Sequence, residues 1–341
     1  MVYYLIRFAS WLAGKVPRRA RLTIAGGTTI LIYYGWVSKR RVTIENMAHI
    51  LGTTTSDPRA RRLARVSWRN FGRYVSDFIY LPNTTRDAII SRLQDTTPPP
   101  GSYALVDKAR EAGKGVILVS THFGAYDVAA IAVANHCPLH LIVETIKDPR
   151  MDHMWQQQRN DLGMEVLRIE KTPRQILRVL QENGVVAVAV DRPVSPGEGV
   201  PITFFGRQCW VPGGIAQIAL KSGAAILPGY CIYDEDYSTT YYLGAGPIIS
   251  PEPTRDRKGD VVRLMQRMFD ALEVQIRARP DQWAMFRRFW PLATTTAMPA
   301  TGGETMQETD TTEPQELSPG GQPDTPVASG QQQDTGGVRP L

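Results

Sequence analysis

The chain has 341 residues, 43% of them hydrophobic and 21% charged, so it can hold one large or two medium domains with a real core and is not disordered as a whole. Its three cysteines lie far apart without a CxxC pair, which argues against a disulfide framework and a cysteine-based zinc site. The net charge of +6 arises at the N-terminus, where residues 1–75 carry 14 Lys and Arg against 2 Asp and Glu; without a zinc-finger, RNP-like or helix-turn-helix motif, this basicity does not indicate a nucleic-acid partner.

An uncharged run from Leu22 to Ser38 is the first candidate element. As a helix it would be about 25 Å long, which is slightly short for a bilayer span. Aromatic residues near its end, followed by the basic run Lys39 to Arg41, are typical of a lipid–water interface. We therefore expect a helix that lies on or dips into the membrane, with the protein at the cytoplasmic face of the cell (inner) membrane, held peripherally or by a single N-terminal membrane helix. A helix in the globular core is the alternative.

The segment from Pro58 to Leu81 predicts a long amphipathic helix. Apolar residues recur at helical spacing, and an arginine stands at every fourth position from Arg61 to Arg73, so the basic side chains form one stripe. Such a stripe is usually a solvated face. It also suits an anionic membrane surface, because each Lys or Arg near acidic head groups adds about 1 kcal/mol of attraction.

After the proline-rich break from Thr96 to Gly101, helical patterns alternate with short apolar runs that lack the period of a half-exposed strand. These runs predict buried strands at residues 115–120, 139–144, 185–191 and 225–233. Helices are expected near residues 102–113, 126–135, 150–162, 173–183 and 213–222, with a long final helix at about 255–279. Thr172-Pro173 with Gly184, and Gly213-Gly214 with Gly223, are good helix start and end signals.

This alternation predicts an α/β fold with a central, mainly parallel sheet flanked by helices. We place the α/β domain at residues 83–290, after a basic N-terminal helical segment for membrane association at residues 1–82. Residues 291–341 carry 1 Lys or Arg against 7 Asp and Glu and almost no large apolar side chains. This acidic C-terminal tail should be disordered, because it cannot bury enough surface to offset its conformational entropy.

His122 follows the apolar run of residues 115–120 closely, which puts it at the carboxyl end of a parallel strand, where open α/β sheets bind their ligands. Asp127 lies five residues on, at the start of the next helix, and a turn at Gly124 could bring its carboxylate back to the imidazole. A carboxylate on one ring nitrogen leaves the other free to take a proton from a hydroxyl. The pair therefore predicts His122 as a general base oriented by Asp127; the alternative is that His122 ends a strand and Asp127 caps a helix.

Other charged residues gather at predicted strand ends and are candidates for binding a substrate. Glu144 ends one strand, Asp191 and Arg192 end another, and Arg159 lies on the helix between them. A carboxylate can bind sugar or glycerol hydroxyls, and an arginine can bind phosphate as a bidentate fork. An ordinary salt bridge is the alternative for each of them.

Three further candidates follow Arg192. Glu198 lies in a Gly-rich loop, and Phe204 and Phe205 end the stretch Ile202-Thr-Phe-Phe. The two phenylalanines could line an acyl channel, with ordinary core packing as the alternative.

The stretch Ser120-Thr-His122-Phe-Gly-Ala-Tyr-Asp127 resembles the His-x-x-x-x-Asp/Glu block of the lysophospholipid acyltransferase superfamily. Within that superfamily it is similar to the lipid A biosynthesis (lauroyl/myristoyl) acyltransferases, including the phosphatidylinositol mannoside acyltransferases. Further blocks similar to this family follow one another in order over residues 40–290: Asn46 onward with Trp68-Arg-Asn-Phe-Gly-Arg73, Val190-Asp-Arg192, Ile202-Thr-Phe-Phe-Gly206 with Pro212 to Pro228, and Pro280-Asp-Gln-Trp283. The loop around Glu198 resembles one near the acceptor in the mannoside acyltransferases.

The resemblance implies a glycerol-phosphate-acyltransferase-like fold that moves a fatty acyl group from acyl-CoA or acyl carrier protein to a hydroxyl of a membrane glycolipid or lysophospholipid. His122 would deprotonate the hydroxyl, which attacks the thioester carbonyl without an acyl-enzyme; no G-x-S-x-G elbow is present. Backbone N–H groups at the start of the helix after His122 would bind the oxyanion. The thioester is a co-substrate, and we expect neither a metal nor a cofactor. Pro193 and the acidic tail depart from the family pattern, which leaves the acceptor open.

Other functions share parts of this pattern. A thioesterase or lipid esterase could use the same pair to activate water. A metal-dependent esterase could use His136 and His140, but Pro138 between them argues against a shared helix face. A non-catalytic membrane scaffold would need only the basic N-terminal segment.

Overall fold

The computed structural model describes residues 2–168, 173–234 and 240–291. Its helices are α1 (Val2–Ala13), α2 (Arg18–Gly35), α3 (Val37–Ile50), α4 (Pro58–Tyr80), η1 (Leu81–Asn83), α5 (Arg86–Ile90), α6 (Ser102–Arg110), α7 (Tyr126–His136), α8 (Pro149–Asp161), α9 (Pro173–Gln181), α10 (Gly214–Ser222), α11 (Arg257–Ala278) and η2 (Pro280–Gln282). Its strands are β1 (Leu93–Asp95), β2 (Val116–Ser120), β3 (Leu139–Val143), β4 (Met164–Arg168), β5 (Val185–Ala189), β6 (Val200–Phe204), β7 (Arg207–Val211), β8 (Ala225–Tyr233) and β9 (Tyr241–Ala245). The predicted tail beyond Pro291 and the predicted cap Thr172 lie outside the described residues.

A seven-stranded sheet with the order β1-β9-β8-β2-β5-β3-β4 forms the centre of the described residues. All neighbouring strands in it run parallel except β8 and β9. The predicted α/β fold with a mainly parallel sheet is therefore confirmed. β2 lies between β8 and β5, and Val116, Ile117 and Val119 on it are buried, as expected for a strand covered on both faces.

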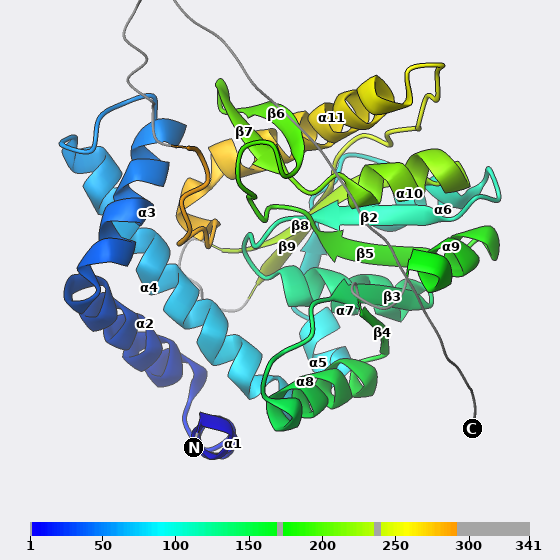
Figure 1. Cartoon of the computed structure of the whole chain (residues 1–341). Helices are drawn as coiled ribbons and strands as arrows, with labels where there is room; N and C mark the ends of the chain where they lie inside the picture. Colours follow the sequence, from blue (N-terminus) through cyan, green and yellow to red (C-terminus); the bar gives the residue numbers. More distant parts are fainter. Residues whose placement is uncertain (1, 169–172, 235–239, 292–341) are drawn as a thin grey trace, which may run out of the picture. The chain divides into compact units, whose positions relative to one another are not determined.

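Helices cover both faces of this sheet (Figure 1). On one face, apolar side chains of β2 and β5 pack with α9, α10 and α11 in a core that includes Ile117, Val186 and Leu264. On the other face, α6 and α7 pack over β2, β8 and β9, with Val106 and Ile131 in that core. Two helical layers around a sheet are the arrangement that apolar, non-alternating strands require.

Each predicted strand and each predicted helix of the α/β domain is present at its predicted place, within a few residues at the ends. Five strands were not predicted: β1 and β9 at one side of the sheet, the edge strand β4, and β6 and β7, which form an antiparallel hairpin. Charged, polar or glycine residues interrupt β1, β4, β7 and β9, so the apolar pattern of these strands is weak.

The N-terminal segment differs from the prediction of one helix over residues 22–38. α2 ends at Gly35, Trp36 breaks the helical backbone, and α3 begins at Val37. Among the described residues, no helix is both long and apolar enough to cross a membrane. The predicted amphipathic helix at residues 58–81 is α4, which Asp57 caps by accepting from the Arg59 N–H.

Helices α2, α3 and α4 pack side by side (Figure 1). A Cβ at Gly72 on α4 would collide with the Ala25 carbonyl on α2, so the close approach of the two helices requires glycine there. At the other end of the contact, Arg18 on α2 forms an ion pair of 2.8 Å with the buried Asp77 on α4. Apolar residues of these helices, such as Trp68, belong to the same core as Ile117 of the sheet. The boundary at residue 82 stays a prediction.

Buried polar side chains of α3 and α4 bind the backbone of the segment after α11. Asn46 donates to the carbonyls of Met285 and Arg287, and Ser67 donates to the carbonyl of Trp283. This segment also reaches the sheet, because the Ala284 N–H donates to the His122 carbonyl at 2.8 Å. It therefore connects the N-terminal helices with the loop that follows β2.

Candidate active site

His122 stands in the loop between β2 and α7. Its backbone is held at both polar groups: the N–H donates to Asp191 Oδ2 at 2.9 Å and the carbonyl accepts from Ala284. Gly124, two residues on, has a positive φ of 63°, and a Cβ there would collide with the Cys231 carbonyl on β8. This tight, glycine-dependent loop presents the imidazole to a cavity, and the side chain of His122 is 40% exposed.

The carboxylate on the imidazole is that of Asp191, two residues after the end of β5, the strand beside β2. Asp191 Oδ1 lies 2.7 Å from His122 Nδ1, and Oδ2 also accepts from the Trp283 indole N–H at 2.9 Å. Asp191 is completely buried. Burial would raise the pKa of this carboxyl, but the neighbouring His122 and the donated hydrogen bonds keep it below its ordinary value.

An ionised Asp191 makes His122 Nδ1 the donor, so the unprotonated nitrogen of the neutral ring is Nε2. The negative charge of Asp191 raises the pKa of His122 above its ordinary value, although burial opposes this effect. The charge of Asp127 raises it further and that of Arg192 lowers it. This arrangement suits a base that accepts a proton and is stabilised as imidazolium.

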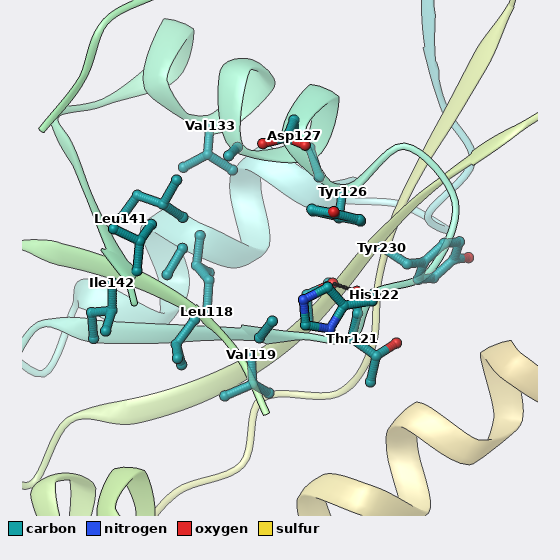
Figure 2. A pocket seen from close by; sticks show the side chains of 18 of the residues that line it. Leu118, Val119, Thr121, His122, Tyr126, Asp127, Val133, Leu141, Ile142 and Tyr230 are labelled. Atoms are coloured by element: carbon teal, nitrogen blue, oxygen red, sulfur yellow. Dashed lines mark hydrogen bonds between the residues drawn. The ribbon is translucent and has the colours of Figure 1, made fainter. Parts of the chain in front are cut away.

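The predicted partner, Asp127, has other contacts. Its Oδ2 accepts a 2.5 Å hydrogen bond from the Tyr74 hydroxyl on α4, and Oδ1 lies 3.9 Å from the Arg159 guanidinium on α8. Burial, followed by the charge of Asp127, raises the pKa of Tyr74 well above its ordinary value. Figure 2 shows Tyr126 between His122 and Asp127. Asp127 thus joins α7 to α4 and α8, and the predicted hydrogen bond between Asp127 and His122 is corrected to one between Asp191 and His122.

A cavity of about 640 Å³ begins at His122 and extends between the sheet and helices α6 and α7. The side chains on the sheet are small at its centre: Ser120 pairs with Ala189 and Gly229 pairs with Ala245, and all four line the cavity. Larger apolar residues continue it along the strands and the covering helices: Leu118, Leu141, Leu227, Leu243, Val106, Ala130 and Val133. A volume and lining of this kind suit a bound aliphatic chain.

Predicted polar residues meet at the same cavity. Glu144 and Arg192, at the ends of β3 and β5, form an ion pair and are both about half exposed. Arg159 also lines the cavity, and its Nε is buried without a hydrogen-bond partner in the described part of the chain. Positive groups at the rim of an apolar cavity suit a substrate with an anionic head and an apolar tail.

Three predicted residues lie elsewhere. Glu198 is exposed, does not line the cavity, and accepts from the Ser195 N–H in its own loop. β6 ends at Phe204 and packs against α11, and Phe205 follows it in the turn of the hairpin; Phe204 is fully buried. The hairpin thus turns these rings into the core on the other face of the sheet, so the prediction that they line an acyl channel is wrong. Aromatic side chains of α4 and α8 line the cavity instead: Phe71, Tyr74, Phe78 and Trp155.

Two backbone N–H groups of the loop before α7 are occupied. The N–H of Gly124 donates to the Gln282 carbonyl and that of Ala125 to the Cys231 carbonyl. These bonds position the His122 loop, and the arginines at the rim are charged donors near the cavity. The oxyanion donors expected at the start of α7 stay a prediction.

The histidines proposed for a metal site each have their own carboxylate partner. His136 bonds Asp107 at 3.0 Å, and His140 lies 2.9 Å from Glu165. Residues 2–168, 173–234 and 240–291 contain no group of three or more His, Cys, Asp or Glu side chains that could hold a metal ion.

Trp283 is a contact of the site that the sequence pattern did not predict. It lies 92 residues from Asp191 in the chain, and an indole in an aromatic-rich segment usually indicates only core packing. The block Pro280-Asp-Gln-Trp283 resembled the family in sequence, but the resemblance did not indicate what Trp283 does.

Comparisons with known proteins agree with this geometry. The model of the family described as bacterial lipid A biosynthesis acyltransferase matches residues 1–291. A protein named phosphatidylinositol mannoside acyltransferase from Mycobacterium tuberculosis (strain CDC 1551 / Oshkosh) is 29% identical over 255 residues, covering 72% of this chain and 75% of that protein. A protein of the same name from Mycolicibacterium smegmatis is 27% identical over 250 residues, covering 72% and 77%. The family match includes the N-terminal helices as well as the sheet.

Proposed function

This chain belongs to the bacterial lipid A biosynthesis acyltransferase family and is an acyltransferase of that type, and we propose that it transfers a fatty acyl group from acyl-CoA or acyl carrier protein to a hydroxyl of a membrane glycolipid. The observation that carries the proposal is the His122–Asp191 pair at the end of an apolar cavity. A phosphatidylinositol mannoside is the acceptor we favour, because both similar proteins carry that activity in their names.

In the proposed reaction, His122 Nε2 takes the proton of the acceptor hydroxyl while the oxygen attacks the thioester carbonyl carbon. The tetrahedral intermediate places negative charge on the former carbonyl oxygen, and the guanidinium groups of Arg192 and Arg159 stabilise it. The carbon–sulfur bond then breaks, and the thiolate takes the proton from the imidazolium. Asp191 keeps the tautomer and stabilises the charged ring throughout.

The other candidate residues that line the cavity each have a place in this proposal. Glu144 binds an acceptor hydroxyl when substrate opens its ion pair with Arg192, and Arg192 and Arg159 bind phosphate groups of the substrates. Asp127 acts by holding Tyr74 and Arg159 at the cavity. No metal or cofactor takes part in these steps.

A hydrolase remains the second candidate, because the same pair could activate water. It would release free fatty acid at the same rate with or without a glycolipid acceptor. A transferase needs the acceptor, so assays with and without it separate the two functions.

We propose that the first two helices bind the cytoplasmic face of the cell membrane peripherally. The large hydrophobic side chains that are exposed in the described residues all lie between Val2 and Val37, apart from Leu51 and Val274. On α1, Trp11 is 58% exposed, and on α2, Leu31 is 74% exposed. Basic residues, including Arg7 and Arg19, lie among them, and such a surface suits an anionic bilayer.

The double variant Trp11→Ser and Leu31→Ser is expected to lower binding to vesicles of anionic phospholipid by about 10-fold or more, because each side chain adds apolar area to the bilayer contact. Co-sedimentation measures the binding. Val274→Ser on α11, which removes an equally exposed apolar residue elsewhere, is the control. Equal binding of the double variant and the wild type would contradict this surface. Deleting residues 1–45 is less informative, because it also removes the Arg18–Asp77 ion pair.

The cavity predicts the length of the acyl chain that the enzyme accepts. Ala130→Leu adds a branched side chain to the lining under α7, so it should lower kcat/KM about 10-fold for long-chain donors and much less for short-chain donors. Ala134→Leu, one turn further along α7 and outside the lining, is the matched control. Rates with acyl-CoA donors of increasing length give the measurement. An unchanged length preference in Ala130→Leu would show that the chain binds elsewhere.

A further inference from the structure

We propose that Trp283 is a positioning residue for acyl transfer: its indole N–H holds the Asp191 carboxylate against His122, and helix α4 holds the tryptophan in place. This inference rests on the proposed role of His122. It assigns a role to a segment that lies far from the His122 loop in sequence and beside it in space.

The Asp191 carboxylate has hydrogen-bond partners at both of its oxygens. Oδ1 bonds the imidazole, whereas Oδ2 accepts from two donors, the Trp283 indole and the His122 backbone N–H, each at 2.9 Å. Of these three contacts, only the Trp283 indole comes from a residue other than His122, so it is the contact that ties the carboxylate to another part of the structure. Asp191 is fully buried, so water cannot replace a lost donor.

The backbone around Trp283 is bonded to the His122 loop. Trp283 and Phe123 form an antiparallel bridge, with the Gly124 N–H donating to Gln282 and the Ala284 N–H donating to His122. Gln282 is itself fixed to β8 by two hydrogen bonds to the backbone of Tyr233. These contacts join the backbone of the Trp283 segment to the His122 loop and to β8.

Helix α4 binds the segment that contains Trp283. Ser67 donates to the Trp283 carbonyl at 3.1 Å, and Asn70 donates to Asp281 at 2.9 Å. Both are buried polar side chains, and both donate to this one segment. Helix α4, from the N-terminal part of the chain, thus helps to position the indole.

The ring itself has little freedom. Trp283 is fully buried and packs against Phe204, Phe289 and Trp290, with ring centroids 6.0, 5.3 and 6.2 Å away. This packing explains why Phe204 belongs to the core: it forms one wall around the positioning indole. A ring that is enclosed in this way delivers its N–H in one direction.

Removing the indole N–H of Trp283 should change the pKa of His122 in a predictable direction. The charged groups that face His122 are Asp191, Asp127 and Arg192, with the Tyr126 ring 5.4 Å away. Without the indole, the charge on Asp191 is less stabilised and attracts the imidazolium proton more strongly, so the pKa of His122 rises. A base must be neutral to act, so the acid limb of the rate profile moves to higher pH.

The test is Trp283→Phe, which keeps an aromatic ring and removes the N–H. We expect kcat to fall about 10-fold at the pH optimum, KM for the acyl donor to stay unchanged, and the acid limb to shift to higher pH. Trp290→Phe is the matched control, because this buried indole donates to the Phe204 carbonyl instead of a carboxylate. Its acid limb should coincide with that of the wild type.

A wild-type acid limb in Trp283→Phe, or an equal shift in Trp290→Phe, would overturn the proposal. If Trp283→Phe does not fold, replacing Trp283 by its benzothienyl analogue keeps the ring outline and removes only the N–H. An NMR titration of ¹⁵N-labelled His122 without substrate should show a raised pKa of His122 in Trp283→Phe and in the benzothienyl variant. An unchanged pKa would contradict the role of the indole. This titration needs no turnover, so a failure of the proposed function is distinguished from a failure of the positioning role.

Discussion

Replacing Asp191 by asparagine is expected to lower kcat for acyl transfer by about 10³- to 10⁴-fold. The amide has nearly the shape of the carboxylate and can still accept from the Trp283 indole. Its NH₂ group would face His122 Nδ1, however, and would favour the tautomer that carries its proton on Nε2. That ring can neither take the hydroxyl proton nor be stabilised as imidazolium, so both parts of the proposed catalysis are lost.

Asp127→Asn is the matched comparison for Asp191→Asn, because it also neutralises a buried carboxylate close to the cavity. Asp127 does not bond the imidazole, so its variant keeps the tautomer and should lose much less activity. The pH profile separates the two further. Both carboxylates raise the pKa of His122, with Asp191 the larger cause, so the acid limb should move to lower pH far more in Asp191→Asn than in Asp127→Asn. Equal losses and equal shifts would contradict the assignment of Asp191.

His122→Ala is expected to remove the general base and to lower kcat by about 10²- to 10⁴-fold, with KM for the acyl donor nearly unchanged. The donor should still bind, because the apolar cavity does not depend on the imidazole. Loss of the ring also leaves the buried Asp191 without one of its donors, which destabilises the fold by about 1–3 kcal/mol.

His122→Asn separates the loss of the base from the loss of stability. Its amide nitrogen can take the place of Nδ1 and donate to Asp191, while no base remains. Both variants should be equally inactive, although only His122→Ala loses stability in thermal unfolding. Activity of His122→Asn close to that of the wild type would remove His122 from the mechanism.

Much of the fold could be predicted from the sequence, because its main strands are short apolar runs between helices with clear end signals. β2 and β5 are buried on both faces and therefore lack alternation. β4 and β9 were missed because their side chains are mixed, whereas β2 and β5 of the same length are continuously apolar or nearly so. The break at Trp36 also escaped prediction, since the uncharged run from Leu22 to Ser38 continues across it.

The site could be predicted only in part, for a topological reason. His122 and Asp127 are close in sequence, which suggested a pair, whereas Asp191 is 69 residues away and follows a strand separated from β2 in the chain by β3 and β4. Only the strand order, with β5 beside β2, places Asp191 at the imidazole. Composition and spacing do not contain that order. The same holds for Phe204, whose direction depends on a hairpin that the pattern did not reveal.

The most direct test of acyl transfer by this chain follows a labelled acyl group. The wild-type protein is incubated with ¹⁴C-labelled long-chain acyl-CoA, or the same acyl group on acyl carrier protein, and a phosphatidylinositol mannoside in phospholipid vesicles. We expect label to enter the glycolipid in equal molar amount to the free thiol released, and thiol release to depend on the glycolipid. Thiol release that is independent of the glycolipid, with all label recovered as free fatty acid, would contradict the proposed transfer.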